Sequence, residues 1–319
     1  MPVAPRIDPK TIFAPEEWAG LTRRSAWRGL SLVVHAWALI LGAGALFIIF
    51  PNPLTYVLAV MIIGARQLGI AILMHDAAHG ALLPNAKWND RIATWLCAAP
   101  TGGSVERYRA YHLMHHKYTE QPEDPDLPLS RPFPISRQSL HRKIIRDLTG
   151  QTFFKQRIAP TFIRWGQIIA GKRPLKPMEG PAVRFWIVNG AAIAALSAAG
   201  YWWAWPALWI VPMATWLPLV TRLRNIAEHA CLSDPADPFR HARTTLANPF
   251  ERLFIAPYWV HFHAEHHMFM HLPCWHLPRA HKLLMEKGYG PRMEIKPSYP
   301  AVLRQAAPRQ AAPRQAAPA

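Results

Sequence analysis

Three long uncharged stretches constrain the fold of this chain more than any other feature of its sequence. Residues 29–50 and 185–221 contain no Lys, Arg, Asp or Glu, and residues 54–74 are interrupted by Arg66 and Gln67. A helix needs about 20 apolar residues to cross the hydrocarbon core of a bilayer. Residues 29–50 and 54–74 each fit one crossing, and residues 185–221 are long enough for two. We therefore predict four transmembrane helices, at residues 29–50, 54–74, 185–200 and 205–222.

Turn-forming and aromatic residues divide these stretches into two hairpins. The sequence Pro51-Asn52-Pro53 forces a turn between the first two predicted helices. The second break is expected between Gly200 and Pro206, among tryptophans that would form an aromatic belt at the far membrane interface. These tryptophans are Trp202, Trp203, Trp205 and Trp209.

The distribution of basic residues predicts the orientation in the membrane. Residues 131–184 contain twelve Lys or Arg and two acids, and Arg23, Arg24 and Arg28 precede the first stretch. Because loops rich in Lys and Arg stay in the cytoplasm, both termini should be cytoplasmic, in a bacterial-type inner membrane. The net charge of +17 is segregated between the uncharged stretches, so we expect a membrane partner and no nucleic acid.

The predicted fold is an all-α integral membrane protein with four transmembrane helices in two hairpins and a cytoplasmic helical cap. Residues 1–28 form a cytoplasmic N-terminal segment, and residues 29–300 form the membrane domain. Within that domain, residues 75–184 are a cytoplasmic loop and residues 225–300 are the cap. Residues 301–319 include RQAAP repeats, which predict a disordered tail that is dispensable for activity.

Two features leave alternatives open. Residues 153–168 mix large apolar side chains with Lys155, Arg157 and Arg164, which predicts a helix in the plane of the membrane interface. The alternative is an ordinary amphipathic helix in the cytosol. Arg66 is costly inside a span, and it either reaches the interface or anchors a network that lines a functional site.

Eight of the sixteen histidines fall into three short groups that end on one side of the predicted membrane. The groups are His75 and His79; His112, His115 and His116; and His263, His266 and His267. Helix positions i, i+3 and i+4 are neighbours on one face, so each group projects its imidazoles together. Eight imidazoles are too many for one ion, which predicts a di-metal site. Imidazole suits iron, zinc, copper and nickel, so the residue type leaves the metal open.

The phrases HDAAHG, YHLMHHKYT, EDPD and FHAEHHMFMHLPCWHLP resemble the membrane fatty acid desaturase family, within the histidine-box di-iron desaturase and hydroxylase superfamily. The resemblance runs from about Leu30 to Met285. It implies two iron ions (Fe2+/Fe3+) and O2 as co-substrate. The family's NxxxH motif matches Asn225-Ile-Ala-Glu-His229, which implies His229 as a ninth ligand and Asn225 as a ligand through water. The alternative for Asn225 is a helix-capping role.

Carboxylates beside the histidines are expected to orient the ligating imidazoles, because a metal-bound imidazole usually donates its other N–H to an acceptor. These acids are Asp76, Glu265, Glu228, Asp124 and Asp126, with Asp76 and Glu265 foremost; a solvated acid is the alternative for each. No catalytic residue is expected beyond the metal ligands. The remaining histidines are interpreted as ordinary structural or surface residues; they are His35, His141, His241, His261, His271, His276 and His281.

The resemblance implies O2-dependent desaturation of a lipid acyl chain. The sequence has no CxxC pair and no haem module, so a separate donor, a ferredoxin or a cytochrome-type protein with its reductase, is expected to supply electrons. The same site run as a lipid or carotenoid hydroxylase or ketolase is the alternative. A histidine-rich metal transporter is disfavoured, because transporter ligands should lie near the membrane midplane, and these groups lie at or beyond the span ends.

Overall fold

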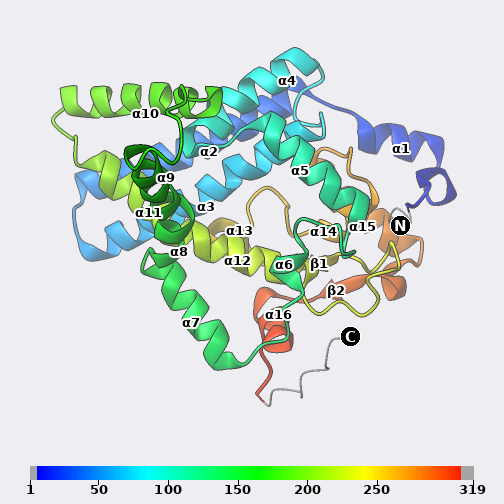
Figure 1. Cartoon of the computed structure of the whole chain (residues 1–319). Helices are drawn as coiled ribbons and strands as arrows, with labels where there is room; N and C mark the ends of the chain where they lie inside the picture. Colours follow the sequence, from blue (N-terminus) through cyan, green and yellow to red (C-terminus); the bar gives the residue numbers. More distant parts are fainter. Residues whose placement is uncertain (1–5, 310–319) are drawn as a thin grey trace.

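The computed structural model describes residues 6–309, which are mostly helical (Figure 1). The helical elements, in chain order, are η1 (Pro9–Thr11), α1 (Pro15–Thr22), α2 (Ala26–Ile49), α3 (Pro53–Ala78), α4 (Ala86–Ile92), η2 (Ala93–Ala98), η3 (Ala99–Thr101), α5 (Val105–Tyr118), α6 (Leu127–Ser130), α7 (Arg137–Leu148), α8 (Gln151–Phe153), η4 (Phe154–Ile158), α9 (Ala159–Ile169), α10 (Gly180–Ala198), η5 (Pro206–Ile210), α11 (Val211–Ala214), α12 (Trp216–His229), α13 (Pro249–Phe254), α14 (His263–Met268), η6 (Cys274–His276), α15 (Leu277–Glu286), η7 (Gly290–Arg292) and α16 (Tyr299–Ala306). The strands are β1 (Arg243–Thr245) and β2 (Glu294–Lys296).

Helices α2 and α3 form the first predicted hairpin. The Ser25 side chain caps α2 by accepting from the Arg28 amide. Helix α3 starts at Pro53, directly after Asn52, whose side chain accepts from the Thr55 amide. Proline fits the first helical position because its missing N–H is not needed there. The predicted turn is confirmed, and α3 runs further than predicted, to Ala78.

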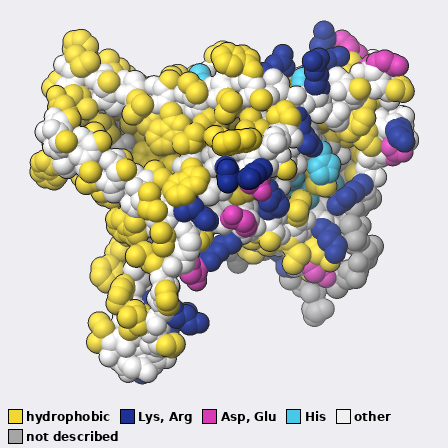
Figure 2. Space-filling view, turned by 90° about the horizontal axis from the view of Figure 1, so that it is seen from above, with side chains coloured by type: hydrophobic (Ala, Val, Ile, Leu, Met, Phe, Trp, Pro, Cys, Tyr) yellow, Lys and Arg dark blue, Asp and Glu magenta, His cyan; other side chains and the backbone are white. Residues whose placement is uncertain are grey.

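Three helices in the described residues are long and apolar enough to cross a membrane: α2, α3 and α10. Only 6% of the most apolar stretch of α10 is buried, against 67% for α3. Helix α3 is buried because it packs against both α2 and α12. Figure 2 shows hydrophobic side chains gathered on the left, where α10 and the α2–α3 hairpin lie in Figure 1, and charged side chains toward the right. Such an exposed apolar surface fits a lipid environment.

The fourth predicted span, residues 205–222, is not one helix. Its residues are divided among η5, α11 and α12, with an interruption at Thr215, where φ is −120° and ψ is −69°. Pro212 and Pro218 lack the backbone N–H that a continuous helix needs. Helical hydrogen bonds are therefore missing on both sides of Thr215. The break predicted between Gly200 and Pro206 is confirmed by the turn between α10 and η5. The four-span topology stays a prediction.

The cap contains a two-stranded parallel sheet, so the fold is not entirely α-helical as predicted. Strand β1 pairs with β2, with Thr244 opposite Ile295. The Arg243 side chain is 1% exposed and donates to the carbonyls of Ala227 and Cys231 at 3.2 and 3.0 Å. This arginine therefore fixes the chain directly after α12, where the sheet contacts both α12 and α14.

The predicted disordered tail is wrong at its start, because residues 301–306 belong to α16. Val302 and Ala306 are each 1% exposed, and the Gln305 side chain donates to the Cys231 carbonyl at 2.9 Å. The amide of Ile135 also donates to the Ala306 carbonyl at 2.9 Å. An apolar face at i and i+4 binds this short helix to the cap. The repeat residues from 310 onward lie outside the described residues.

The predicted helix at residues 153–168 is helical as α8, η4 and α9. It presents large apolar side chains to the outside, with Phe162 69% and Ile169 82% exposed. Its position at the membrane interface stays a prediction.

Candidate metal centre

The C-terminus of α3 positions the first two histidines. His75 lies in the last turn and His79 is the C-cap residue. Gly80 follows with φ +67°, its amide bonded to the Ala77 carbonyl, and the Ala81 amide is bonded to the Asp76 carbonyl. This pattern is a Schellman motif, which needs a left-handed residue after the cap and so favours glycine. The motif turns the chain away immediately beyond His79.

Three other helices supply the remaining histidines of the site. Helix α5 is capped by the Ser104 side chain and carries His112, His115 and His116. The short helix α14 carries His263, His266 and His267, and α12 ends at His229. All nine predicted histidines are buried.

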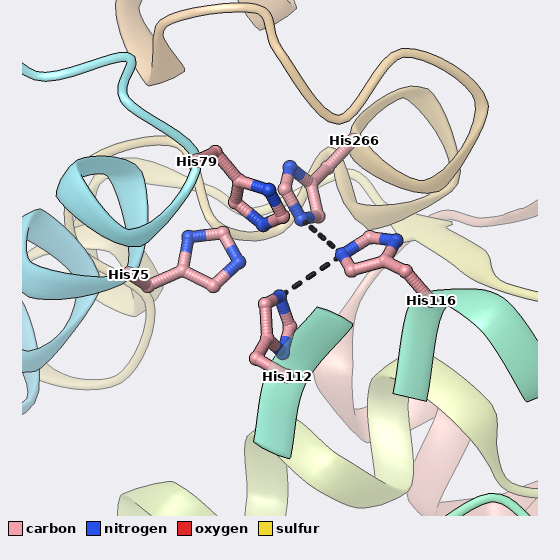
Figure 3. A group of neighbouring side chains, drawn as sticks. All are labelled: His75, His79, His112, His116 and His266. Atoms are coloured by element: carbon pink, nitrogen blue, oxygen red, sulfur yellow. Dashed lines mark hydrogen bonds between the residues drawn. The ribbon is translucent and has the colours of Figure 1, made fainter. Parts of the chain in front are cut away.

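These nine histidines converge in two adjacent groups. The first group is His75, His79, His112, His116 and His266 (Figure 3), and the second is His115, His229, His263 and His267. Within each group, one nitrogen of every ring lies within 4.8 Å of the others. The groups adjoin, because the ring centroids of His116 and His267 are 4.4 Å apart. The structure thus brings together every histidine predicted for a di-metal site.

The division between the groups follows from helix geometry. Residues i and i+4 point about 40° apart around a helix, whereas i+3 lies about 60° in the opposite direction. On α5, His112 and His116 therefore enter the first group and His115 enters the second. On α14, His263 and His267 enter the second group and His266 enters the first. Each of these helices contributes to both groups.

The nitrogen spacing fits metal ligation. The Nε2 atom of His116 is 2.9 Å from that of His112 and 3.0 Å from that of His266. In the second group, Nε2 of His263 is 2.9 Å from that of His229 and 3.0 Å from that of His267. Two nitrogens each about 2.1 Å from one ion and at a right angle would be about 3.0 Å apart.

The protonation of the rings also suits ligation. Both ring nitrogens of His79 are buried and have no hydrogen-bond partner within residues 6–309, although buried polar atoms normally have one. Burial, and then the charge of neighbouring imidazoles, hold the pKa values of His112, His116, His263 and His267 well below the usual range. These rings are therefore neutral at pH 7, and a neutral ring leaves one nitrogen lone pair for a metal.

Carboxylates accept from the outward-facing nitrogens of several of these rings. The Nδ1 atom of His115 is 2.8 Å from Oδ1 of Asp124, and that of His75 is 3.4 Å from Oδ1 of Asp76. Asp76 also accepts from the Cys274 amide at 2.8 Å. Asp124 and Asp76 thus contact cluster histidines, and their role behind metal-bound rings stays a prediction. Each leaves the opposite ring nitrogen facing the group.

Glu228 and Asp126 lie slightly further from their histidines. Glu228 Oε1 is 3.5 Å from Nδ1 of His263 and 2.5 Å from Nε of Arg224. Asp126 Oδ2 is 3.7 Å from Nδ1 of His115. Both acids adjoin the second group, as predicted.

Glu120 was not expected from the sequence. Its Oε1 lies 3.4 Å from Nδ1 of His229 and accepts from Ser130 at 3.0 Å. Burial raises the pKa of this carboxyl to about 7. Glu120 has a φ of 59° in the turn after α5, and its distance of more than a hundred positions from His229 in the chain gave no sequence signal.

Glu265 does not orient a cluster histidine, so that prediction is wrong. Its two carboxylate oxygens instead accept from Thr244 Oγ1 and from Nδ1 of His281, the latter at 2.6 Å. Glu265 lies on α14 between two ligand positions and faces away from the groups. It joins α14 to β1 and α15.

Asn225 lies four residues before the end of α12, within the helix, so it is not the capping residue. It lines a small pocket together with His115, His229 and His263. Asn225 therefore lies beside the second group, and its role as a ligand through water stays a prediction.

None of the seven histidines interpreted as ordinary residues belongs to either group in the described chain. His241 is nevertheless a close neighbour that the sequence did not indicate. Its carbonyl lies 3.2 Å from Nδ1 of His229, and its ring centroid is 5.4 Å from that of His267. Burial lowers the pKa of His241 to about 4. It supports the second group through its backbone.

A larger cavity of about 350 Å³ adjoins this site. At its membrane end it is lined by Leu68, Ala71 and Leu217, and it extends to Tyr108 and Asn225. These last two residues also line the small pocket beside the histidines. The ring of Tyr108 stacks on that of His112, with centroids 5.1 Å apart. The cavity therefore connects the apolar part of α3 with the edge of the histidine groups.

Three membrane-length helices and nine convergent imidazoles define a helical membrane protein with a site that could hold two metal ions. The chain belongs to the fatty acid desaturase family, whose model matches residues 51–297. It is 28% identical over 250 residues to the dihydrorhizobitoxine desaturase of Bradyrhizobium elkanii, covering 73% of this chain and 69% of that protein. It is 27% identical over 260 residues to the beta-carotene ketolase of Paracoccus sp. (strain PC1), covering 79% and 87% of the two chains. One relative is named as a desaturase and the other as a ketolase, so the chain belongs to a family of oxidoreductases.

Proposed function

We propose that this protein is a membrane di-iron oxidoreductase that uses O2 to desaturate a lipid acyl chain. The observation that carries the proposal is the convergence of nine buried histidines into groups of five and four. The ligands would be His75, His79, His112, His116 and His266 for one iron, and His115, His229, His263 and His267 for the other. Asn225 would contribute through water. Bound iron would supply the oxidising power that removes hydrogen from an unactivated C–H bond, which side chains alone lack.

The residues around the cavity support an amphiphilic substrate. Leu68, Ala71 and Leu217 give its membrane end an apolar wall, while Thr152 and Arg157 line it elsewhere. Such a cavity suits an apolar chain with a polar end group. Tyr108 and Asn225 would place a segment of that chain beside the metal ligands and exclude water from it.

A second candidate is oxygen insertion by the same centre, giving a hydroxylated or keto product. The similarity to a beta-carotene ketolase over 79% of this chain favours this alternative. Both reactions use the same ligand set, so the products distinguish them.

Electrons would come from a separate donor, a ferredoxin or a cytochrome-type protein with its reductase. The histidine side of the membrane and both termini would be cytoplasmic, in a bacterial-type inner membrane. Reporter fusions near Pro51 and at Gly200 should locate both positions on the opposite side. A cytoplasmic signal at either one contradicts the four-span topology.

The test is expression in a host of known lipid and carotenoid content, followed by mass spectrometry of extracted products. Desaturation gives products lighter by two hydrogens, and hydroxylation gives products heavier by one oxygen. Formation of a keto group adds one oxygen and removes two hydrogens. His267→Ala, at matched membrane expression, is the inactive control. If the wild-type protein contains bound iron and is supplied with a reductase but forms neither a desaturated nor an oxygenated product, the proposal is contradicted.

A further inference from the structure

A cavity separate from the histidine site lies between α2, α3 and α13. Its volume is about 660 Å³, and its walls include His35, Arg66, Arg252 and Tyr258. It shares no lining residue with the cavity or the pocket beside the histidines. The volume lies within the range of small-molecule sites. The proposed oxidation therefore does not account for this cavity.

Arg66 gives the cavity a charge on α3, a helix that is long and apolar enough to cross a membrane. It lies nine residues before His75 on α3, about 13 Å along the helix axis, and is only 3% exposed. Its Nη2 donates to the carbonyls of Arg252 and Leu253, at 3.2 and 2.6 Å, in the last turn of α13. Its Nε is buried without a hydrogen-bond partner in the described chain. The two carbonyls are neutral, so the Arg66 guanidinium keeps its full positive charge. Its Nε–H also remains available as a donor.

The surroundings of Arg66 favour an anion. Arg252, which is exposed, is a second basic residue of the wall, and no Asp or Glu lines this cavity in the described part of the chain. The Tyr258 ring lies 5.5 Å from the Arg66 guanidinium carbon, which attracts the cation without neutralising it. An arginine inside a span pairs with an opposite charge or with backbone carbonyls, and the carbonyls that accept from Arg66 carry no net charge. An anionic group would complete this arrangement.

Hydrogen bonds and an unusual backbone conformation fix Tyr258 in the wall of the cavity. The Tyr258 hydroxyl lies 3.0 Å from Nδ1 of His35 and donates to the Leu32 carbonyl at 3.3 Å. Tyr258 and Trp259 have φ values of 53° and 58°, which bulky residues rarely adopt. A Cβ on Gly69 would lie 2.7 Å from the Tyr258 ring, so glycine permits this close approach. The tertiary contacts thus hold a strained turn at the cavity.

The surface beside the cavity is apolar. Val34 on α2 is 66% exposed, and Phe250 and Leu253 on α13 are 61% and 37% exposed. Val34 precedes His35, and Leu253 itself lines the cavity. An occupant should therefore combine an anionic group with apolar chains.

We propose that this cavity binds an anionic phospholipid, with its phosphate on Arg66 and Arg252 and its acyl chains against α2 and α13. Basic pockets between membrane helices are known to take anionic lipid head groups. This gives Arg66 a binding role distinct from the oxidation site. The bound lipid would fix α13 against the α2–α3 hairpin.

The experiment uses the full chain, freed of lipid in detergent and titrated with phosphatidylglycerol or phosphatidylcholine while the melting temperature is followed. Phosphatidylglycerol should raise the melting temperature, and phosphatidylcholine should not. Arg252→Gln removes the charge but keeps the carbonyl that accepts from Arg66. It should weaken phosphatidylglycerol binding roughly fivefold, the effect of one basic residue at an anionic lipid surface. Arg142→Gln, an exposed charge on α7, should leave binding unchanged.

Several results would overturn the proposal. Equal stabilisation of the wild-type protein by both lipids removes the preference for an anion, whatever the variants do. An equal loss in Arg142→Gln and Arg252→Gln assigns the effect to general surface charge. A full shift with soluble glycerol phosphate assigns the site to a small phosphate and not to a lipid. The iron content of Arg252→Gln should match the wild type, which checks that the variant is folded.

Discussion

The Nδ1 atom of His115 lies 2.8 Å from Oδ1 of Asp124, and the two side chains are 2% and 1% exposed. Asp124 also accepts from the amides of Glu120 and Asp126, both at 2.8 Å. Three donors therefore hold one carboxylate in the turn after α5, and the carboxylate holds the ring. This fixes which nitrogen of His115 faces the second histidine group.

Asp124→Asn should lower iron affinity about 10–100-fold, the usual effect of losing the acceptor behind a ligating histidine. The amide cannot accept as strongly from His115 and carries no charge. Iron retained per chain during competition with a chelator measures the change. Glu123→Gln is the matched control, because Glu123 is exposed on the same turn. Equal iron retention in the two variants would show that Asp124 does not tune the site.

His229→Ala should abolish product as completely as His75→Ala or His267→Ala. Its Nε2 is 2.9 Å from that of His263 in the second group, so its loss opens a ligand position. The measurement is product per unit of membrane-expressed protein. His141→Ala should stay active because His141 is exposed on α7. His281 is a poorer control than the sequence suggested, since it bonds to Glu265 on α14. Substantial activity in His229→Ala would leave eight ligating histidines.

His112→Ala and His115→Ala should each affect a different ion, although the residues are three apart on α5. Each single variant should retain about one iron per chain in place of two. Combining His79→Ala with His112→Ala removes two ligands from one group and should still leave one iron. Combining His79→Ala with His115→Ala should leave almost none. Indistinguishable double variants in elemental analysis would contradict the division into two groups.

Truncation after Pro300 should lower stability by roughly 3 kcal/mol, through the lost burial of Val302 and neighbouring side chains. Truncation after Pro308 keeps α16 and should be neutral. The melting temperatures of the two truncated proteins in one detergent give the comparison. Equal melting temperatures would mean that α16 is not needed to hold the cap.

Gly64→Ala should destabilise the protein by about 1–3 kcal/mol, the usual result of overpacking. A Cβ at Gly64 would lie 2.7 Å from Cβ of Trp216, where α3 approaches α12. Gly42→Ala is the matched control, because nothing lies within 4 Å of a Cβ there. That substitution should be neutral or stabilise α2 by up to about 1 kcal/mol. A thermal melt that ranks the two variants in the opposite order would refute this account of the packing.

The sequence predicted eight of the nine convergent histidines because their spacing is a local property of helices, and the resemblance to the desaturase family implied the ninth, His229. It also contained the division into groups, since adjacent residues such as His115 and His116 point about 100° apart. Treating each motif as one face concealed that signal. Glu120 and the carbonyl of His241 reach His229 through tertiary packing, so spacing along the chain could not reveal them. Glu265 shows the reverse case: its position between ligands suggested a contact that its helix face prevents.

The membrane helices were similarly predictable where apolar length alone decided the structure, as in α2 and α3. The predicted span at residues 205–222 depended on backbone continuity, which Pro212 and Pro218 weaken around Thr215. The short helix α16 was hidden by repeats that suggest disorder, although Val302 and Ala306 lie one helical turn apart. The prolines are a local signal of the interruption, whereas α16 depends on contacts with distant residues such as Cys231 and Ile135.

The small buried fraction of α10 has a consequence for handling this protein. Nineteen helical residues span about 28 Å, close to the hydrocarbon thickness of about 30 Å. With 6% of its apolar stretch buried, the helix is held partly by Asn189, which donates to the Pro100 carbonyl at 3.2 Å and accepts from Trp205 at 3.1 Å. Hydrophobic mismatch should therefore tilt α10 before it disturbs α3. Ile40 and Gly44 on α2 line an apolar cavity together with Val188 and Ala192 on α10. A detergent micelle or bilayer of altered thickness would change the shape of this cavity while leaving the histidine groups in place.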